Sequence, residues 1–270
     1  MRKLTLVKVG GAELKDGPEL TELVDALARL VAERDVIVVH GGGVEIADLQ
    51  QRLGLKPQFI EGLRVTDEES LRVAEMVLSG LVNKRLTARL VARGVKAIGI
   101  SGVDGGLLRA ERLRHPKGDL GHVGEITQVQ ADCLAQLCAD GFTPVISPIS
   151  LGSDGRPLNV NADHAALAIA SALGVGEAVF LTDVPGVMRE GVILETLNAR
   201  EAKRMIENGQ ITGGMIPKVQ GCIEALEKGV TRTHIIDGRI PHCILLEIFT
   251  YRGIGTMIMK ERKLYEHEKL

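Results

Sequence analysis

The sequence predicts an α/β protein whose helices pack around a mainly parallel sheet. Short runs of β-branched residues alternate with stretches in which apolar residues recur at helical spacing, as in repeated βαβ units. Most predicted strands are continuous apolar runs, as expected for parallel strands covered on both faces. No run of about 18 apolar residues, the length that spans a membrane, occurs in the sequence.

The predicted strands and helices follow one another along most of the chain. The first helix has the clearest pattern, because Leu20, Val24 and Leu27 belong to one apolar stripe that continues to Val31. Later helices begin after glycine-rich or polar junctions that are suited to capping. The predicted strands are 4–9, 36–40, 97–101, 143–147, 178–183 and 233–237, and the predicted helices are 20–31, 44–53, 67–93 and 163–173.

The segment 107–129 departs from this alternation. Pro116 and Gly118 separate two short candidate strands, which predicts an antiparallel hairpin inserted beside the sheet. Any lobe boundary near 174–177 is compact, because no Ser/Pro-rich linker occurs there. The charged residues at 259–270 predict a frayed tail.

Composition excludes several classes of function. The net charge is −2, so no basic excess indicates nucleic-acid binding. Only six residues are aromatic and none is Trp, which argues against stacking platforms for bases or sugars. The four cysteines show neither metal-ligand spacing nor a disulfide framework, so we expect reduced thiols in the cytoplasm and no dedicated protein metal site.

Two glycine-rich junctions follow predicted strands. Lys8 ends the first strand and is followed by Gly10 and Gly11; a lysine there implies a nearby anion, although a buried salt bridge explains it equally well. The second strand ends at 40–43, His-Gly-Gly-Gly, and leads into a helix. Glycines at a helix N-terminus expose backbone amides, which favours binding of phosphate or carboxylate.

Polar side chains mark three further junctions. Arg64 precedes the long predicted helix and suits bidentate binding of a carboxylate, although an ordinary surface arginine is the commoner case. Asn159, Asn161 and Asp163 open another helix, where Asn161 or Asp163 serves as a cap or holds a ligand. Lys218 lies in the first turn of a helix, where the macrodipole disfavours a cation, so a functional role is favoured.

Taken in this order, these segments resemble the amino acid kinase family from about residue 4 to residue 258. Within the family the resemblance is strongest to members that phosphorylate N-acetyl-L-glutamate. The segments that resemble the family are Lys-Val-Gly-Gly, His-Gly-Gly-Gly, Gly-Leu-Arg-Val-Thr, Leu-Gly-His-Val-Gly, Asn-Val-Asn-Ala-Asp, Thr-Asp-Val-Pro-Gly-Val, Gly-Gly-Met-Ile-Pro-Lys and Leu-Glu-Ile-Phe-Thr.

The resemblance implies a three-layer αβα sandwich with two lobes. Residues 1–174 would bind the acyl amino acid and form the dimer, and 175–258 would bind ATP, the co-substrate.

The resemblance also implies a role for each matching residue. Lys8 and Lys218 would stabilise the transferring phosphoryl group, Asp163 would orient both lysines, and Gly11 would contact the phosphate. Gly42, Gly43, Arg64 and Asn159 would hold N-acetyl-L-glutamate, with the Gly42 amide also contacting the phosphate; Asp183, Val184, Pro185, Gly186, Val187, Met188, Gln210, Ile211 and Thr212 would line the nucleotide site.

The chemistry agrees with this assignment. A side-chain carboxylate has a pKa of about 4.3, so the nucleophile is already ionised and needs no general base. Phosphoryl transfer then requires in-line positioning and neutralisation of charge on the phosphoryl oxygens. Mg²⁺ would be bound mainly through phosphate oxygens. His40, His122 and His164 are expected to have structural or secondary roles.

Assembly and two alternative functions stay open. Only seven residues precede Lys8, whereas arginine-inhibited relatives have an extra N-terminal helix, so we expect a homodimer without strong arginine feedback; a nitrogen-signalling protein partner is an unsupported option. One alternative is a kinase acting on carrier-protein-linked aminoadipate or glutamate in lysine biosynthesis. The other is an inactive ligand sensor on the same fold, which retention of Lys8, Asp163 and Lys218 argues against.

Overall fold

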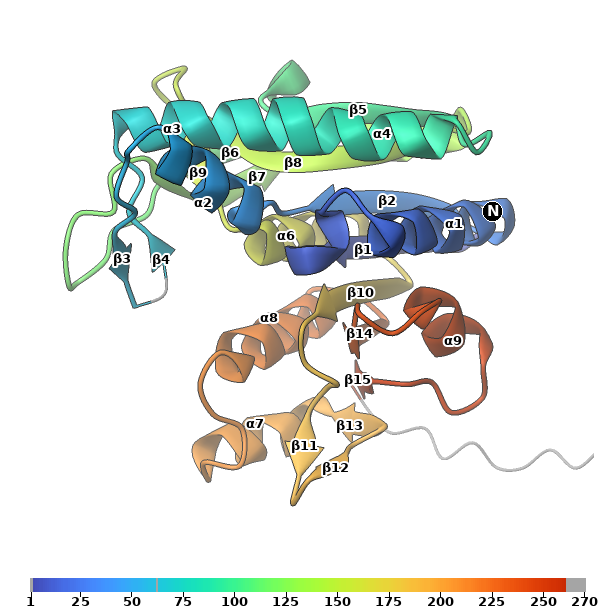
Figure 1. The fold of residues 1–270 in the computed structure, drawn as a ribbon. Helices are drawn as coiled ribbons and strands as arrows, with labels where there is room; N and C mark the ends of the chain where they lie inside the picture. The colour runs from blue at the N-terminus through green and yellow to red at the C-terminus, as the bar shows by residue number, and fades with distance from the viewer. Residues whose placement is uncertain (1, 62, 261–270) are drawn as a thin grey trace, which may run out of the picture.

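A single mixed sheet runs through the protein in the computed structural model, which describes residues 2–61 and 63–260 (Figure 1). The strand order is β13-β15-β14-β10-β1-β2-β8-β6-β7-β9, with β5 paired to β8. Strands β14, β10, β1, β2, β8 and β5 are parallel neighbours. The strands of this sheet are β1 (Leu4–Val9), β2 (Asp35–His40), β5 (Ala97–Gly102), β6 (Leu108–Arg112), β7 (Val123–Val129), β8 (Thr143–Gly152), β9 (Pro157–Val160), β10 (Glu177–Thr182), β13 (Thr196–Asn198), β14 (Arg232–Asp237) and β15 (Thr256–Met259).

Helices cover both faces of this sheet, which confirms the predicted three-layer αβα sandwich. Side chains alternate along β1, so that Leu6 joins one hydrophobic core and Val7 the other. The Leu6 side is covered by α5 (Ala131–Ala139), α6 (Ala162–Leu173), α7 (Ala199–Glu207) and α8 (Met215–Glu227). The Val7 side is covered by α1 (Pro18–Glu33), α2 (Gly43–Arg52), α3 (Glu68–Glu75), α4 (Asn83–Val91) and α9 (Cys243–Phe249).

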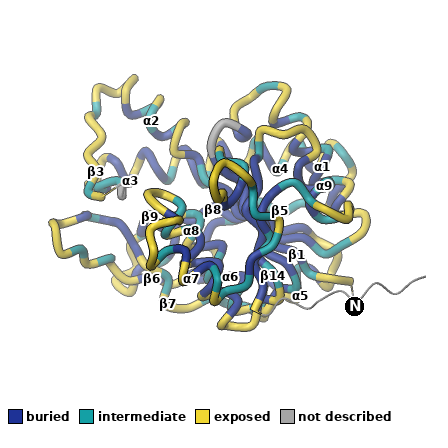
Figure 2. The backbone as a smooth tube through the Cα atoms, turned by 90° about the horizontal axis from the view of Figure 1, so that it is seen from below, coloured by how far each residue is buried: buried dark blue, intermediate teal, exposed yellow. Residues whose placement is uncertain are grey.

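Buried residues concentrate along the central strands, such as β1 and β8, while the loops around them are mostly exposed (Figure 2). Burial on both faces explains why these strands read as continuous apolar runs in the sequence. Two small hairpins lie outside the main sheet, β3 (Phe59–Ile60) with β4 (Leu63–Arg64) and β11 (Met188–Arg189) with β12 (Val192–Ile193). The short 3₁₀ segments are η1 (Gly11–Leu14) and η3 (Asp104–Gly106).

The predicted elements are found with three differences. Strand β8 runs to Gly152, five residues beyond the predicted end, because its second half pairs with β6 and β9. The predicted hairpin at 107–129 forms as β6 and β7, but it joins the main sheet through β8 and β9 rather than lying beside it. The predicted helix 67–93 contains a π-helical segment, η2 (Met76–Val82), between α3 and α4.

Local sequence explains where the helices around the site begin. Asp67 caps α3 by accepting a hydrogen bond from the Ser70 backbone N–H at 2.8 Å. Asn161 caps α6 by accepting from the N–H groups of Asp163 and His164, which decides between the two candidate caps. Helix α2 begins after Gly42 without a side-chain cap. Its first amides are therefore available to a ligand.

The C-terminal ends of β1, β2 and β10 lie side by side, because β1 pairs in parallel with both neighbours. Lys8, the glycines after His40 and the segment after Thr182 therefore meet at one edge of the sheet, where ligands of open α/β sheets bind. Among the described residues, no helix is both long and apolar enough to cross a membrane. Of the tail predicted at 259–270, Met259 belongs to β15 instead, and residues 261–270, like Gly62, lie outside the described residues.

Candidate active site

A carboxylate held between two ammonium groups forms the centre of the site. Lys8 Nζ lies 2.8 Å from Asp163 Oδ1, and Lys218 Nζ donates to Asp163 Oδ2 at 2.9 Å. The three residues come from the end of β1 and the first turns of α6 and α8. Asp163 is free for this role because Asn161 is the cap of α6. The sequence left two explanations for Lys8, a bound anion or a buried salt bridge. In the structure Lys8 forms a salt bridge and also lines a cavity, so the two are compatible.

The electrostatics of this cluster keep Asp163 ionised. Burial alone would raise the pKa of the Asp163 carboxyl, but the two ammonium groups outweigh it and lower the pKa to about 2. One carboxylate between two lysines leaves a local excess of positive charge. That excess suits an anion carrying several negative charges, such as a phosphoryl group in transfer.

Gly10 makes room for the Lys8 side chain. A Cβ atom at this position would lie only 2.7 Å from Lys8 Nζ, so a larger residue would displace the ammonium group. Lys8 itself is 8% exposed. Gly10 therefore leaves the space that the Lys8 ammonium group occupies. Gly11 follows it as the first residue of η1.

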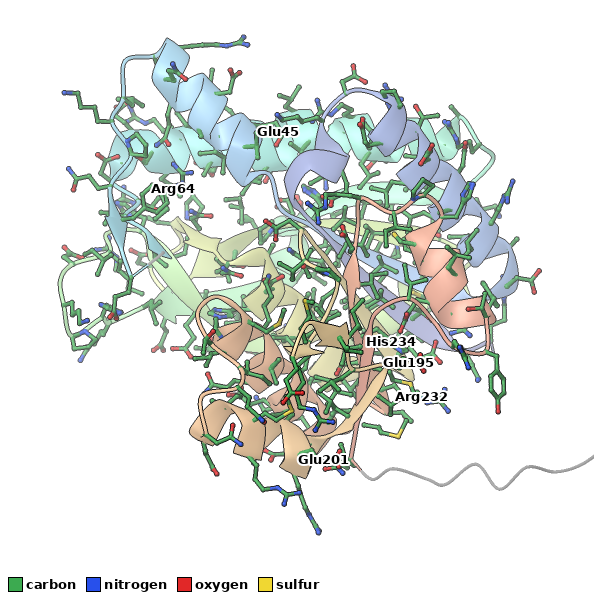
Figure 3. All side chains as sticks on the ribbon, turned by 60° about the horizontal axis from the view of Figure 1, so that its bottom comes forward. Glu45, Arg64, Glu195, Glu201, Arg232 and His234 are labelled. Atoms are coloured by element: carbon green, nitrogen blue, oxygen red, sulfur yellow. The ribbon has the colours of Figure 1, made fainter. Side chains whose placement is uncertain are left out.

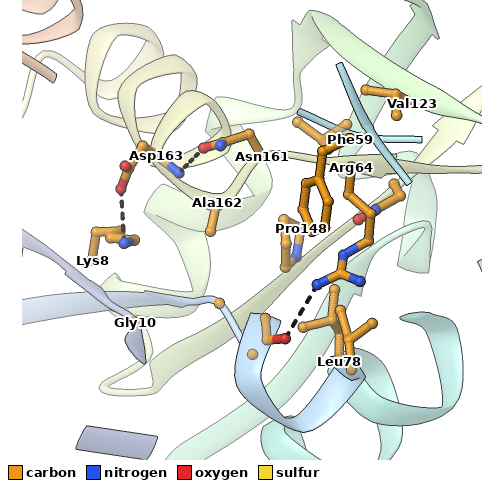
Figure 4. A pocket seen from close by; sticks show the side chains of 16 residues that line it. Lys8, Gly10, Phe59, Arg64, Leu78, Val123, Pro148, Asn161, Ala162 and Asp163 are labelled. Carbon is orange, nitrogen blue, oxygen red and sulfur yellow. Dashed lines mark hydrogen bonds and ion pairs between the residues drawn. The ribbon is translucent and has the colours of Figure 1, made fainter. Parts of the chain in front are cut away.

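A cavity of about 310 Å³ opens beside this cluster (Figure 4). Its lining combines cationic and amide groups with apolar side chains. Six of the eight predicted catalytic and substrate-binding residues line it; Lys218 is not among the lining residues that the structure describes, but it contacts the lining Asp163. The lining residues are Lys8, Gly10, Gly41, Gly42, Gly43, Ile46, Phe59, Arg64, Leu78, Val123, Pro148, Asn159, Val160, Asn161, Ala162 and Asp163.

The uncapped N-terminus of α2 faces this cavity. A Cβ atom on Gly42 would lie 2.8 Å from Leu78 Cδ2, so the backbone packs directly against the π-helical segment η2. Around Gly43, by contrast, no atom lies within 4 Å of such a Cβ. The exposed amides and the positive end of the helix dipole are the features that favour anion binding at such a junction.

Arg64 lies on the far side of the cavity from Asp163, stacked on Phe59 with its guanidinium carbon 4.9 Å from the ring centroid (Figure 4). Its Nη1 donates to Gln50 Oε1 at 2.5 Å, and its Nη2 donates to the Gly43 carbonyl at 3.5 Å. Burial lowers the pKa of Arg64, but a guanidinium stays charged at neutral pH. Arg64 is therefore not an ordinary surface arginine, although that is the commoner environment for this residue type.

Asn159 reaches the site from β9. Its Nδ2 donates to Thr66 Oγ1 at 3.2 Å, and Thr66 Oγ1 in turn donates to the Arg64 carbonyl. The Asn159 backbone N–H donates to the carbonyl of His122 at 2.9 Å, which joins this strand to the loop before β7. Two predicted substrate-binding residues, Arg64 and Asn159, are thus linked through one hydroxyl group.

His40 has a structural role. Its ring is fully buried, and burial lowers its pKa to about 4, so the imidazole is neutral at physiological pH. The Asn83 side-chain amide lies 3.0 Å from Nε2 and also donates to the carbonyls of Ile100 and Val145. This contact connects the end of β2 to α4, β5 and β8, and so holds the glycine turn in place.

The predicted nucleotide-binding residues occupy two segments in the C-terminal part of the chain. The first, at 183–188, follows β10, and Val187 and Gly186 pack against Thr256 of β15. The second, at 210–212, joins α7 to α8 and leads towards Lys218. The side chains of Val187 and Ile211 belong to the hydrophobic core. None of these nine residues lines the cavity beside Lys8.

Two residues that hold the Arg64 side chain were not among the predicted site residues. Phe59 stacks on Arg64, and Gln50 accepts its hydrogen bond. Gln50 was detectable in principle, because it is a polar residue four positions after Ile46 on the buried stripe of α2. Phe59 has no such signal, since its contact depends on how the β3–β4 hairpin folds over α2.

Other cavities contain few of the predicted residues. One of about 570 Å³ is lined by Glu177, Arg232, His234 and Glu247 among others, and another of about 600 Å³ includes Gln210. Figure 3 shows Arg232, His234 and Glu195 well away from Arg64 and Glu45. The described residues include no group of three or more His, Cys, Asp or Glu side chains suited to hold a metal ion.

Sequence comparison identifies the family. The sequence model of the amino acid kinase family matches residues 3–237. The chain belongs to the amino acid kinase family. An acetylglutamate kinase of Symbiobacterium thermophilum is 45% identical over 269 residues, which cover 96% of this chain and 92% of that relative. An acetylglutamate kinase of Caldicellulosiruptor saccharolyticus is 46% identical over 264 residues, which cover 95% and 90% of the two chains.

Solved structures agree with this membership. An N-acetylglutamate synthase of Neisseria gonorrhoeae, complexed with coenzyme A and N-acetyl-glutamate, has a TM-score of 0.87 and 28% identity to this kinase. That similarity covers 97% of this chain but only 60% of the synthase chain. A carbamate kinase of Giardia lamblia bound to AMP-PNP shares the fold with a TM-score of 0.68 at 15% identity, over 96% of this chain and 99% of that one.

Proposed function

We propose that this kinase transfers the γ-phosphoryl group of ATP to the side-chain carboxylate of N-acetyl-L-glutamate. The products are N-acetyl-L-glutamyl 5-phosphate and ADP, a step in arginine biosynthesis. One observation supports this above all: Asp163 holds Lys8 and Lys218 together beside a cavity that also contains Arg64 and Asn159. The acetylglutamate kinases that resemble the chain over nearly its whole length support the same substrate.

The acyl amino acid would occupy the 310 Å³ cavity. Arg64 would bind a carboxylate, because a guanidinium offers two parallel donors to such a group. Asn159 would hold an amide or carboxylate oxygen through its side chain, next to the Gly42 and Gly43 backbone. The apolar side chains of Ile46, Leu78 and Val123 would contact the methylene and methyl groups of the substrate.

The phosphoryl group would lie between the acyl amino acid and the nucleotide. The attacking carboxylate is ionised at neutral pH and needs no base, so the protein contributes positioning and charge. Lys8 and Lys218 would neutralise charge on the phosphoryl oxygens as the O–P bond to ADP breaks and the bond to the carboxylate forms. The amides of Gly11 and Gly42 would donate to the same oxygens.

ATP would be bound by the C-terminal lobe, 175–258, against 183–188 and 210–212. A lobe division at 174–175 coincides with the end of α6, where Gly174 adopts a left-handed conformation. Mg²⁺ prefers oxygen ligands and keeps several waters, so the ATP phosphates would be its main ligands. It would supply further positive charge to the β- and γ-phosphates.

The test is trapping of the acyl phosphate with hydroxylamine in the presence of Mg-ATP. N-acetyl-L-glutamate is compared with free glutamate, aspartate and α-aminoadipate derivatives. We expect a hydroxamate from N-acetyl-L-glutamate at a rate at least about tenfold above the others, since one methylene is worth about 1 to 3 kcal/mol in a pocket. Product from an aminoadipate derivative alone, or ATP binding without any product, would refute the proposal.

A further inference from the structure

Gln50 is a buried polar residue on a helix face that is otherwise apolar. Its side chain is fully buried on α2, four residues after Ile46, which belongs to the hydrophobic core. A buried amide costs free energy unless both of its ends form hydrogen bonds. Gln50 meets this condition: Oε1 accepts from Arg64 Nη1 at 2.5 Å, and Nε2 donates to Ser70 Oγ at 2.9 Å.

The contacts fix the orientation of the Gln50 amide. Because a guanidinium only donates, the carbonyl end must face Arg64, and the NH₂ end then donates to the Ser70 hydroxyl. Ser70 is itself held at the start of α3, where its backbone N–H donates to the Asp67 cap. Gln50 therefore presents an acceptor to Arg64 from a position anchored to two helices.

The guanidinium of Arg64 is held on three sides. Gln50 and the Gly43 carbonyl each accept one of its hydrogen bonds, and Phe59 covers one face. A guanidinium has five N–H donors, so three remain for a ligand in the cavity. Without Gln50, only the long contact to the Gly43 carbonyl and the stacking on Phe59 would hold the guanidinium. More of its ordering would then occur on ligand binding, which lowers affinity through conformational entropy.

We propose that Gln50 is a positioning residue that orients Arg64 towards the carboxylate of the bound acyl amino acid. The inference rests on the proposed function, in which Arg64 binds that carboxylate. Gln50 does not line the cavity, so its effect on the substrate would pass through Arg64. The contact between Gln50 and Arg64 includes no residue of the proposed nucleotide site at 183–188 and 210–212.

The kinetic test compares Gln50→Leu with the neighbouring Gln51→Leu, whose side chain is exposed. We expect Gln50→Leu to raise KM for N-acetyl-L-glutamate by roughly tenfold, with kcat and KM for ATP changed less than about threefold. Gln51→Leu should resemble the wild type. Gln50→Glu keeps the side-chain shape and should raise KM at least as much, because a carboxylate facing Arg64 competes with the substrate.

A double-mutant cycle separates positioning from a general packing effect. In the Arg64→Lys background, Gln50→Leu should change KM by less than about twofold, because the guanidinium that Gln50 orients is absent. An equal tenfold effect in both backgrounds would contradict the proposal, as would an unchanged KM in a folded Gln50→Leu variant. Thermal unfolding of each variant establishes that it is folded.

A measurement independent of activity completes the test. In ¹⁵N NMR of the Arg64 side chain, assigned with Arg64→Lys, rotation of the guanidinium should be slow in the wild type and fast in Gln50→Leu. If the wild type forms no acyl phosphate, the proposed function fails, and the NMR comparison alone decides whether Gln50 orients Arg64. Equal rotation rates in both proteins would overturn the inference.

Discussion

Two clusters, each with one carboxylate and two cations, lie at opposite ends of the central strands. At the C-terminal end of β1, Asp163 lies between Lys8 and Lys218. At the N-terminal end of β10, Glu177 forms ion pairs with Arg34 and, at 3.7 Å, with Arg232. Each cluster is one carboxylate with two cations, yet the surroundings of the two clusters differ.

The difference lies in the backbone around each cluster. Residues of both clusters line cavities, but the cavity beside Lys8 and Asp163 also has glycines and the uncapped start of a helix in its wall, so these cations face a place suited to an anion. Arg34 instead donates to Thr5, stacks on Phe249 and fixes α1 to the sheet. The place of a cluster at the end of a parallel sheet, more than the identity of its charges, therefore determines whether it is suited to bind a ligand.

The largest expected effect is on turnover at the first cluster. Lys8→Ala or Lys218→Ala should lower kcat by about a hundredfold or more, by analogy with the loss of one preorganised charge-stabilising donor. Steady-state kinetics measures it, with Lys203→Ala as the matched control, because Lys203 forms an exposed ion pair with Glu227. Near-normal turnover in a folded Lys8→Ala variant would remove the catalytic assignment.

At the second cluster we expect a loss of stability instead. Arg34→Ala should lower the free energy of unfolding by about 3 kcal/mol, because it leaves Glu177, whose side chain is 9% exposed, without its nearest partner. Arg52→Ala is the control; its ion pair with Asp48 is exposed, so the loss should stay below about 0.5 kcal/mol. Denaturant unfolding measures both. A folded Arg34→Ala variant with a large loss of kcat and no loss of stability would erase the distinction between the clusters.

A smaller effect is the pH dependence of stability from Asp163. Its pKa is about 2 in the folded protein against an ordinary 3.8, so the folded state binds fewer protons between these values. The stabilisation, about 2 kcal/mol from the pKa difference, is fully present above pH 4 and is lost as the pH falls towards 2. The stability difference between the wild type and Asp163→Asn should therefore stay constant from pH 8 to about pH 5. A difference that declines steadily over that range would contradict the low pKa.

Much of this account could be predicted from the sequence, because its signals are local. Lys8 before two glycines, the glycine run after His40 and the polar start of α6 each follow a strand, and the carboxyl ends of parallel strands must meet. The choice between Asn161 and Asp163 as the cap was not predictable. It depends on which side chain turns back to the helix, and Asp163 instead pairs with Lys8 and Lys218, which come from distant segments.

Other features depend on contacts between distant segments. The pairing of Arg34 with Glu177 joins residues 143 positions apart, and Arg64 meets Gln50 only after β4 folds over α2. The π-helical segment at Met76–Val82 interrupts an otherwise regular helical pattern that gave no sign of it. The nucleotide-site residues, the homodimer and the cytoplasmic location remain predictions.

The most direct test of the central claim is a crystal structure with N-acetyl-L-glutamate, ADP, Mg²⁺ and aluminium fluoride, a mimic of the transferring phosphoryl group. We expect the fluoride ligands to lie within hydrogen-bonding distance of Lys8 Nζ and Lys218 Nζ, with the side-chain carboxylate of the substrate in line and Arg64 at the other end of the substrate. A mimic bound away from both lysines, or an acyl amino acid outside the cavity lined by Arg64 and Asn159, would contradict it.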